Sequence, residues 1–531
     1  MSVTPAKLPS SAKEIVDTKN FMDRVVPLYE QGVGDIELEA DLETARSAIP
    51  AASGAPRDFS FIAPEIPEFI QENCVGCMDC VTECPDTAIL GKVIGKEKLD
   101  EKFDEMPDDK REHVQNEWAK TRKYWTAYEK KSEEPGYFGI FIDPSKCKGC
   151  AECVQVCDDQ ALKMVKKTDS NMPVIKERFD HFHDVGSSDE KYIKDKVLAD
   201  MMLADRSLQY VGGAGSCAGC GEATVLRMFI AATCYVYGQE NVGLIAATGC
   251  NTVYTSTYPY NPYNLPWSNS LFENAPTYAM GVRAKWDQQG WEDKKVWVIG
   301  GDGAMLDIGF QALSRMLMSG MDIKVIVLDT QVYSNTGGQA STSTFMGQNT
   351  KMSVHGKEIA GKTERRKELA QIVMAHPDVF FAQTTAAHVN HFYKAIMRAN
   401  EFKGPAVINT YTTCQPEHGV GDHLAGERAR LAVMSRAFPL MIYDPEKGER
   451  IRDRLDLKGN SLPDKDWYIN PKTKEKVDFV EFARGEGRFE KHFDKEGNPS
   501  EELLLGNEDR RKNWRMLQEL AGIEPETPEE A

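Results

Sequence analysis

Cysteine shows the clearest chemical pattern in this sequence, because eight of its thirteen cysteines lie in two copies of one run. The first copy has the spacing Cys-x-x-Cys-x-x-Cys-x-x-x-Cys-Pro, and the second repeats it with Asp158 in place of the proline. In runs of this spacing three thiolates bind irons of one [4Fe-4S] cluster, and the fourth binds the other cluster. The cysteines are Cys74, Cys77, Cys80 and Cys84 in the first copy, and Cys147, Cys150, Cys153 and Cys157 in the second.

The repeat therefore predicts two [4Fe-4S] clusters with crossed ligands. One cluster would take Cys74, Cys77, Cys80 and Cys157, and the other would take Cys147, Cys150, Cys153 and Cys84. A pair of zinc sites is the alternative, but structural zinc normally needs only two such thiols from each arm. Asp158 replaces a residue that is not a ligand, so the substitution leaves the prediction intact.

A second chemical pattern combines glycine, carboxylate and hydroxyl residues. Gly301-Asp302-Gly303-Ala304 follows one apolar run, and the segment Asp329 to Gln339 follows the next. Mg²⁺ prefers hard oxygen ligands in octahedral geometry, and a bridged diphosphate would add two of them. A Gly-Asp-Gly turn alone is common, but its pairing with Asn335 across a helix and a strand is the thiamine diphosphate signature. The protein ligands to Mg²⁺ would be the Asp302 carboxylate, the Thr330 hydroxyl and the Val332 carbonyl.

These residues need a scaffold, and short apolar runs predict one. The runs Val242–Ala246, Lys295–Gly300, Ile323–Asp329 and Pro405–Thr410 are nearly all apolar, which is typical of strands buried on both faces. Helix-like segments separate them, so we expect an α/β fold with a doubly wound parallel sheet. In such sheets ligands bind at the carboxyl ends of the strands, where both glycine-rich and hydroxyl-rich segments begin.

Composition limits the class of protein further. A chain of 531 residues predicts roughly three or four domains at about 100 to 200 residues each. The formal net charge of −18 argues against a nucleic-acid-binding role, which needs a basic surface. An odd number of clustered cysteines favours metal ligands in a reducing compartment over disulfides. No apolar run reaches the ~18 residues of a membrane span, and the N-terminus lacks a signal-peptide core, so we expect a cytoplasmic protein without membrane contact.

With these motifs the chain resembles the C-terminal half of pyruvate:ferredoxin (flavodoxin) oxidoreductase, from about residue 60 to the end. The resemblance also rests on four further segments: Cys217–Glu222, Ala247–Cys250, Pro266–Glu273 and Tyr411–Cys414. It implies a doubly wound thiamine diphosphate-binding domain and a ferredoxin-like 2[4Fe-4S] α+β domain with an inserted helix. We place that amphipathic helix between Lys96 and Lys131, with Val114, Trp118 and Trp125 at rough helical spacing.

The expected domain order follows from the motifs and the resemblance. The expected units are an N-terminal arm or linker with one helix (1–58), the ferredoxin-like domain (59–170), a connector (171–205), the thiamine diphosphate-binding domain with a proximal cluster (206–425) and a C-terminal extension of helices and loops (426–531).

The resemblance implies a role for most of the remaining motif residues. A third, proximal [4Fe-4S] cluster would be held by Cys217, Cys220, Cys250 and Cys414, whereas Cys234 lies in an apolar helical run and should be a core residue. Asn335 is the expected catalytic residue, and His418 is expected to be structural. The cofactor would be contacted by Glu222, Cys250, Gly301, Asp302, Gly303, Ala304, Thr330, Gln331, Val332, Tyr333, Ser334 and Asn335.

The implied reaction is the thiamine- and CoA-dependent oxidative decarboxylation of pyruvate, or its reverse, with electrons passing through three [4Fe-4S] clusters to ferredoxin or flavodoxin. In the family the pyrimidine-binding and CoA-binding parts belong to N-terminal domains, for which residues 1 to 60 leave no room. We therefore expect a second subunit that supplies them, unless the chain is a fragment. Pyruvate is favoured by the Trp267–Ser270 block; the alternatives are another 2-oxoacid, an electron-transfer subunit without its own catalysis, and a non-oxidative thiamine lyase.

Overall fold

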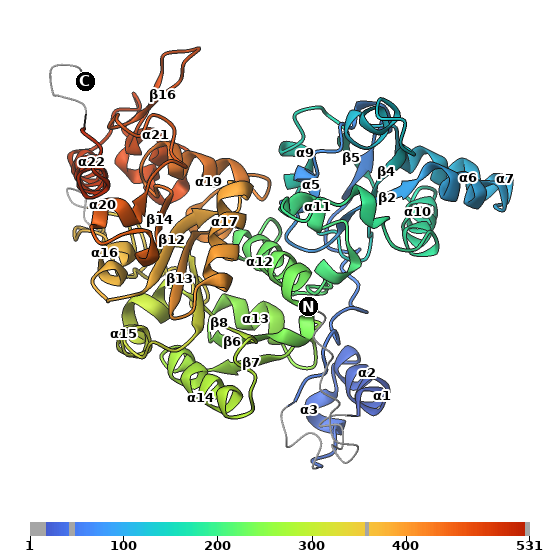
Figure 1. The fold of residues 1–531 in the computed structure, drawn as a ribbon, viewed down its shortest axis with the longest axis horizontal. Helices are drawn as coiled ribbons and strands as arrows, with labels where there is room; N and C mark the ends of the chain where they lie inside the picture. Colours follow the sequence, from blue (N-terminus) through green and yellow to red (C-terminus); the bar gives the residue numbers. More distant parts are fainter. Residues whose placement is uncertain (1–16, 42–47, 356–359, 526–531) are drawn as a thin grey trace.

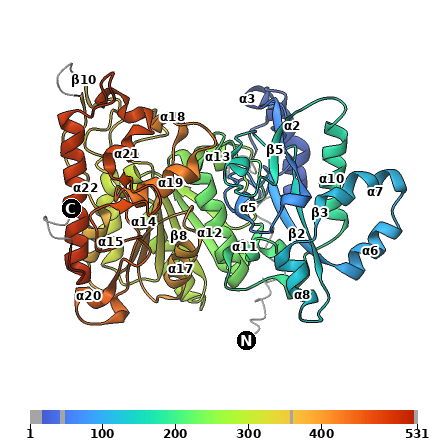
Figure 2. The same cartoon turned by 90° about the horizontal axis from the view of Figure 1, so that it is seen from above.

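The computed structural model describes residues 17–41, 48–355 and 360–525 of the chain. Figure 1 shows a larger lobe built on a long sheet and a smaller lobe beside it. Helix α12 (Gly221–Tyr237) lies between the lobes in both Figure 1 and Figure 2, and its side chains reach the smaller lobe. The helix therefore belongs to the contact that joins the cysteine repeats to the larger lobe.

The larger lobe contains an eight-stranded sheet in the order β15-β14-β12-β13-β9-β8-β6-β7. Strands β12, β13, β9, β8, β6 and β7 pair in parallel, whereas β14 and β15 pair antiparallel. The predicted parallel α/β sheet is thereby confirmed. The strands are β6 (Val242–Ala247), β7 (Trp267–Ser270), β8 (Lys295–Gly301), β9 (Ile323–Asp329), β12 (Phe380–Thr385), β13 (Ala406–Tyr411), β14 (Met441–Tyr443) and β15 (Leu455–Asp456).

The central strands are apolar throughout because both faces of the sheet are covered. Along β8, Trp297 and Ile299 contribute to one hydrophobic core, whereas Val296 and Val298 contribute to the core on the opposite face. Successive side chains of a strand point to opposite faces, so a strand between two helical layers needs apolar residues at every position.

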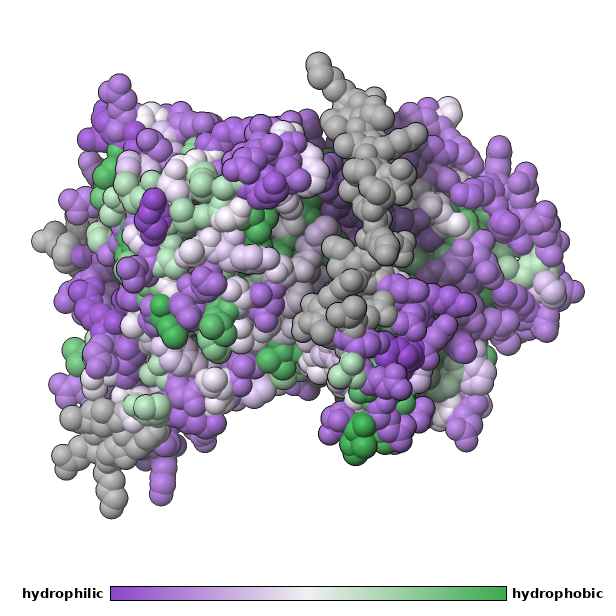
Figure 3. All heavy atoms as spheres, turned by 90° about the horizontal axis from the view of Figure 1, so that it is seen from below, coloured by the Kyte–Doolittle hydropathy of each residue, from purple (hydrophilic) through white to green (hydrophobic). Residues whose placement is uncertain are grey.

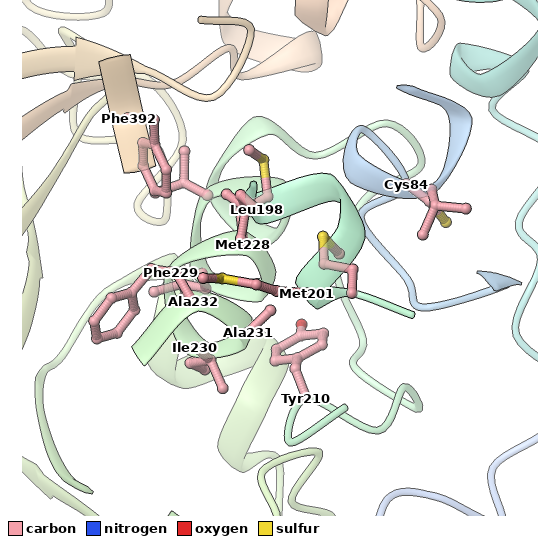
Figure 4. Close-up of a cluster of buried hydrophobic side chains, with 14 of the residues drawn as sticks. Cys84, Leu198, Met201, Tyr210, Met228, Phe229, Ile230, Ala231, Ala232 and Phe392 are labelled. Carbon is pink, nitrogen blue, oxygen red and sulfur yellow. The ribbon is translucent and has the colours of Figure 1, made fainter. Parts of the chain in front are cut away.

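Helices cover both faces. On one side α12 and α17 (Val389–Glu401) pack on the sheet, and Figure 4 shows Met228, Phe229 and Phe392 in the core that they share with α11 (Leu198–Met201). The opposite face is covered by α14 (Ala275–Gln288), α15 (Phe310–Leu317), α16 (Leu369–Met374) and α22 (Glu501–Ala521). Other elements of this lobe are α13 (Cys250–Ser256), α18 (Gln415–His418), α19 (Ala425–Met434), α20 (Ile451–Arg454), α21 (Phe479–Arg484), β10 (Val354–His355), β11 (Ala360–Gly361), β16 (Tyr468–Ile469) and β17 (Lys476–Val477).

The smaller lobe has the α+β architecture expected of a ferredoxin-like module. A three-stranded antiparallel sheet in the order β2-β4-β3 lies beside the antiparallel pair β1 and β5. A short helix follows the start of each cysteine run, which gives the two copies the same local structure. The elements are β1 (Glu65–Phe69), α5 (Asp79–Thr82), β2 (Ile89–Gly95), β3 (Trp118–Ala119), β4 (Gly136–Ile142), α9 (Glu152–Gln155) and β5 (Leu162–Lys166).

The prediction of a single inserted helix between the cysteine runs is wrong. The segment forms α6 (Lys96–Asp104), α7 (Asp108–Val114), strand β3, a π-helical turn at Arg122–Thr126 and α8 (Ala127–Glu129). Proline at 107 disfavours helix at the residue before it, and the edge of β4 offers backbone partners to Trp118 and Ala119. Val114, Trp118 and Trp125 are buried as expected, but each comes from a different element.

The C-terminal segment is more than the helices and loops that the sequence predicted. It supplies β14 and β15, which extend the main sheet, and helix α22, whose Trp514 and Leu517 belong to its core. Strands of three and two residues are too short to show a period, which is why the sequence did not reveal them.

The N-terminal arm contains more helix than one expected element. Its described part forms α1 (Thr18–Asn20), a π-helical turn at Phe21–Val25, α2 (Val26–Glu30) and α3 (Gly34–Glu37), which pack against Tyr258 and Tyr260. The connector contains α10 (Met172–Asp184) and α11. Among the described residues, no helix combines the length and apolar character that crossing a membrane requires.

Candidate functional site

The cysteine runs are shaped by backbone that curls around the thiols. Gly76 and Gly149 occupy the left-handed region at φ +78° and +68°. A Cβ atom on Gly149 would lie 2.4 Å from the Cβ of Ala63, so both the backbone angle and the space require glycine there. The runs continue into α5, which contains Cys80, and α9, which contains Cys153.

The structure brings the cysteines of the two runs together in the crossed grouping that the spacing predicts. Cys157 of the second run lines one small cavity with three thiols of the first run, and we name these four the first set. Cys84 of the first run lies close enough to Cys147, Cys150 and Cys153 to interact electrostatically with each of them, and we name these four the second set. The first set is Cys74, Cys77, Cys80 and Cys157; the second set is Cys84, Cys147, Cys150 and Cys153.

Burial disfavours thiolates in both sets unless a cation joins them. Burial, with neighbouring thiols adding to it, raises the pKa of Cys74 to about 12 and that of Cys77 to about 11. Among the described residues, no three His, Cys, Asp or Glu side chains could hold one single metal ion. A [4Fe-4S] cluster makes a different demand, because its four thiolates bind four separate irons around a larger body. Each set could hold such a cluster.

A third set of thiols lies at the edge of the large sheet. Cys220 is the N-cap of α12, Cys250 begins α13, and Cys414 is the N-cap of α18. Together with Cys217 they line a cavity of about 250 Å³. Burial raises the pKa of Cys414 to about 12, although a backbone N–H at the helix start opposes this. We name these four cysteines the third set. The fold thus brings together the sequence segments that contain them.

The predicted diphosphate residues form a neighbouring cavity of about 280 Å³. Strands β8 and β9 end beside each other at its floor, which places their following turns against the same space. Of the residues predicted to contact a cofactor, only Gln331 is not among those lining this cavity. The lining residues are Glu222, Cys250, Gly301, Asp302, Gly303, Ala304, Thr330, Val332, Tyr333, Ser334 and Asn335, together with Thr248, Gly249, Asn251, Phe272, Ile308 and Thr336.

The three oxygens predicted to bind Mg²⁺ lie close together, because the Asp302 carboxylate and the Val332 carbonyl both contact the Thr330 hydroxyl. Thr330 Oγ1 lies 3.2 Å from Asp302 Oδ1 and 3.0 Å from the Val332 carbonyl. The other carboxylate oxygen of Asp302 accepts bonds from Ser341 Oγ at 2.6 Å and Ser343 Oγ at 2.7 Å. Burial and the charge of Asp329 raise the pKa of Asp302 to about 7, so a cation here would offset the cost of its charge. This hard oxygen set fits Mg²⁺.

Glu222 lies between the two cavities. It is buried, and its Oε2 has no hydrogen-bond partner among the described residues. Burial and the charge of Asp302 raise its pKa to about 8. The residues that line both the diphosphate cavity and the cavity of the third set are Glu222, Cys250, Thr330, Ser334 and Asn335. The two cavities therefore share a wall, and groups bound in them would be neighbours.

A buried polar layer that the sequence did not predict supports the loop after β9. Asp329 forms a buried ion pair with Arg366, and Arg488 Nη1 donates to Gln331 Oε1 at 3.0 Å. His418 Nε2 lies 2.8 Å from the Thr330 carbonyl, which fits the structural role expected for it. The run of hydroxyl residues that begins at Ser341 was the one sequence signal that could have indicated this layer. Single arginines such as Arg366 and Arg488 gave no such signal. Cys234 is fully buried on α12, as expected of a core residue.

Exposed apolar side chains lie on or beside the segments that line the two cavities: Ile308 lines the diphosphate cavity, Val253 lines the cavity of the third set, and Leu271 precedes the lining residue Phe272. Val253 of α13, Leu271 after β7 and Ile308 after β8 are 52%, 62% and 61% exposed. Figure 3 views the molecule from the side of β7 and α14, where apolar residues are interspersed over the larger lobe and hydrophilic residues dominate the smaller lobe. We name Val253, Leu271 and Ile308 the apolar rim, and they are a candidate surface for a partner protein.

Comparison with known proteins gives two family matches. Residues 247–410 match the model of the thiamine pyrophosphate enzyme C-terminal TPP-binding domain, and residues 140–163 match that of the 4Fe-4S binding domain. The chain thus contains a domain of each kind, and the second match covers the second cysteine run.

Individual relatives agree with these matches. The chain is 32% identical to pyruvate synthase subunit PorB of Pyrococcus furiosus, over 60% of this chain and 94% of that protein. It is 35% identical to PorB of Methanocaldococcus jannaschii, over 47% of this chain and 84% of that protein. It is 26% identical to the probable pyruvate-flavodoxin oxidoreductase of Escherichia coli, over 76% of this chain and 38% of that protein. The chain therefore spans well under half the length of this longer relative.

Proposed function

The chain belongs to the pyruvate:ferredoxin (flavodoxin) oxidoreductase family, and on this premise we propose that it is the subunit that binds thiamine diphosphate and three [4Fe-4S] clusters. Its enzyme would oxidatively decarboxylate pyruvate with CoA, or run the reverse reaction, and exchange electrons with ferredoxin or flavodoxin. The relatives PorB and pyruvate-flavodoxin oxidoreductase are the source of the substrate and of the electron acceptor in this proposal.

The observation that supports this function best is the shared wall between the two cavities. Bound thiamine diphosphate supplies the carbon chemistry next to a 2-oxo group, and the protein contributes position and electrostatics. Asp302, Thr330 and the Val332 carbonyl would hold Mg²⁺ against the diphosphate. Cys250 belongs to the third set and also lines the diphosphate cavity, so an electron leaving the cofactor would have a short path to the third cluster.

The rest of the active site would come from a second chain. The chain covers 94% of PorB of Pyrococcus furiosus, which is named a subunit, but only 38% of the Escherichia coli oxidoreductase. The apolar rim is where such a partner would bind, and its pyrimidine- and CoA-binding domains would close the site over the cofactor. Asn335 is exposed, lines the diphosphate cavity and is our candidate catalytic residue from the present chain.

Two alternative functions are less well supported. A subunit devoted to electron transfer has no need of the buried oxygen set around Thr330, which this chain retains in full. A different 2-oxoacid remains the second candidate, because residues that select the substrate would lie mostly on the partner.

The test is to purify the chain anaerobically with its companion and to measure viologen reduction by 2-oxoacids. Viologen reduction by pyruvate that depends on both CoA and thiamine diphosphate would support the proposal. Preference for 2-oxoglutarate or a branched 2-oxoacid would replace pyruvate as the substrate. No reduction with any 2-oxoacid, despite a full complement of iron and bound thiamine diphosphate, would overturn the function.

A further inference from the structure

Arg227 is a buried arginine at the contact between the lobes. It lies on α12, two turns after Cys220, and is 2% exposed. Its side chain leaves the larger lobe and ends among backbone carbonyls of the smaller lobe. Nη1 donates to the Cys84 carbonyl at 3.0 Å and to the Val81 carbonyl, and Nη2 donates to the Ile89 carbonyl at 3.3 Å. The guanidinium therefore touches the backbone of a cysteine of the second set.

This guanidinium has no counterion in direct contact within the part of the chain that the structure describes. No carboxylate of the described residues forms an ion pair with Arg227, and its Nε lacks a hydrogen-bond partner among them. Asp86 is a carboxylate whose charge acts on it, but Asp86 is already paired with Lys148 at 2.6 Å. The three buried groups Arg227, Lys148 and Asp86 together leave one positive charge beside the second set.

A buried cation without a counterion has a high desolvation cost, because an arginine keeps its proton in proteins. Hydrogen bonds to three carbonyls do not by themselves account for a buried arginine at this position. Cys84 and Cys80, one in each set of the smaller lobe, are among the main electrostatic neighbours of Arg227, whereas no thiol of the third set is. A cluster with four thiolates has net negative charge, and reduction adds another, so its potential depends on nearby fixed charges.

We propose that the fixed positive charge of Arg227 raises the reduction potential of the cluster held by the second set, Cys84, Cys147, Cys150 and Cys153. This higher potential would favour electron transfer from the third cluster into the smaller lobe. This inference rests on the proposed function, because it requires that the second set binds a cluster. The effect on the first set should be weaker, since the direct contact is made to Cys84 and not to Cys80.

The experiment is a redox titration of the anaerobically purified complex with dithionite, followed by EPR of the reduced clusters. In Arg227→Met we expect the ratio of oxidised to reduced cluster of the second set, at a fixed potential, to rise about tenfold. This corresponds to a midpoint potential lowered by about 59 mV for a one-electron couple. Arg227→Lys keeps the charge and should restore most of the potential. Asp86→Asn removes the negative charge and should shift the same cluster in the opposite direction, which keeps the test decisive if Arg227→Met does not fold.

A matched control separates charge from general destabilisation. Arg283 on α14 is equally buried, at 1% exposed, and donates to the carbonyls of Trp291 and Lys294, which follow that helix; it also pairs with Asp287 at 2.7 Å. Arg283→Met should leave every midpoint potential unchanged. Unchanged potentials in both Arg227→Met and Asp86→Asn, with clusters present, would overturn this inference and leave the proposed function standing. Equal shifts in Arg227→Met and Arg227→Lys would also overturn it, since charge would not be the cause. A wild-type protein without iron would instead refute the proposed function.

Discussion

Arg488 Nη1 donates a hydrogen bond to Gln331 Oε1 at 3.0 Å, which joins the C-terminal segment to the loop between two candidate Mg²⁺ ligands. The backbone of Gln331 is in the left-handed region, at φ +58°, which costs free energy for any residue other than glycine. The surrounding contacts hold it there: Thr344 Oγ1 donates to its carbonyl at 2.7 Å, and Arg488 is fixed in turn by Glu486 at 2.6 Å. Gln331 is thus a support of the site and not part of its lining.

Loss of Arg488 should weaken cofactor binding from beneath the loop. Arg488→Met alone leaves Glu486 as an unpaired buried charge, so we expect a loss of stability of about 3 to 5 kcal/mol. The double variant Glu486→Gln with Arg488→Met removes the whole pair and should regain much of that stability. Its dissociation constant for Mg²⁺-thiamine diphosphate should still rise about tenfold, as expected for one lost hydrogen bond to a charged group. Wild-type affinity in a folded double variant would show that Gln331 needs no such support.

Asp302→Ala should abolish binding of Mg²⁺-thiamine diphosphate, because this buried carboxylate is the single charged ligand among the three converging oxygens. The absorbance of the clusters in the smaller lobe should remain. Calorimetric titration with the cofactor measures the first effect and a visible spectrum the second. Asp444→Ala, which removes a buried carboxylate paired with Arg398 at 2.8 Å, is the control and should bind normally. Retained affinity in Asp302→Ala would show that the diphosphate site lies elsewhere.

Three sets of four thiols predict about twelve irons per chain, at four per cluster. Anaerobic iron and sulfide analysis of the purified chain measures this number directly. Cys414→Ala should lower it to about eight, because only the third set loses a ligand. Cys234→Ala is the matched control, since Cys234 is fully buried but belongs to no set, and it should keep about twelve irons. About eight irons in the unaltered chain would remove the third cluster from the proposal.

The isolated chain should not oxidise 2-oxoacids, and activity should appear only with a second polypeptide. Purification from the native host should therefore recover a companion of at least domain size, bound through a large interface of the obligate class. Leu271→Asp, beside the lining residue Phe272 of the diphosphate cavity, should reduce this co-purification and the activity together. Leu505→Asp alters a leucine of similar exposure on α22, 57% against 62%, and should alter neither. Robust CoA-dependent pyruvate oxidation by the homogeneous chain would refute the two-chain enzyme.

His181 should make the smaller lobe sensitive to mild acid. Its Nε2 accepts the Trp118 indole N–H at 3.2 Å, and burial lowers its pKa to about 4. An unfolded histidine has a pKa near 6.5, so between pH 6.5 and 4 the unfolded chain binds more protons. Stability from this group is therefore complete above pH 6.5 and is lost as the pH falls toward 4, by up to about 3 kcal/mol.

Thermal unfolding of the wild type and His181→Gln at pH 7.5 and 5.0 tests this sign. The glutamine variant should lose less stability on acidification, because it has no group to protonate. His183→Gln on the same helix changes an exposed histidine and should follow the wild type. Identical pH dependence in all three proteins would contradict the assignment.

The sequence by itself determined those features that depend on neighbouring residues. The cysteine spacing predicts clusters because three ligands of each come from one short loop, and the apolar runs of β6, β8, β9 and β13 predict the sheet because both faces of these strands are buried. The turns at Asp302 and Thr330 could be placed at the same sheet edge for the same reason, since parallel strands end together.

Only the tertiary structure decided which distant segments meet. It brought Cys414 to Cys217 at one edge of the sheet, added the short strands β14 and β15 at the side, and divided the inserted segment among several elements where one helix was expected. It also placed Arg227 beside Cys84 and Arg488 beneath Gln331. Periodicity and spacing report the local environment of a segment, whereas a single buried side chain that reaches another segment leaves no repeating pattern. Its partner is set by how the helices and sheets pack.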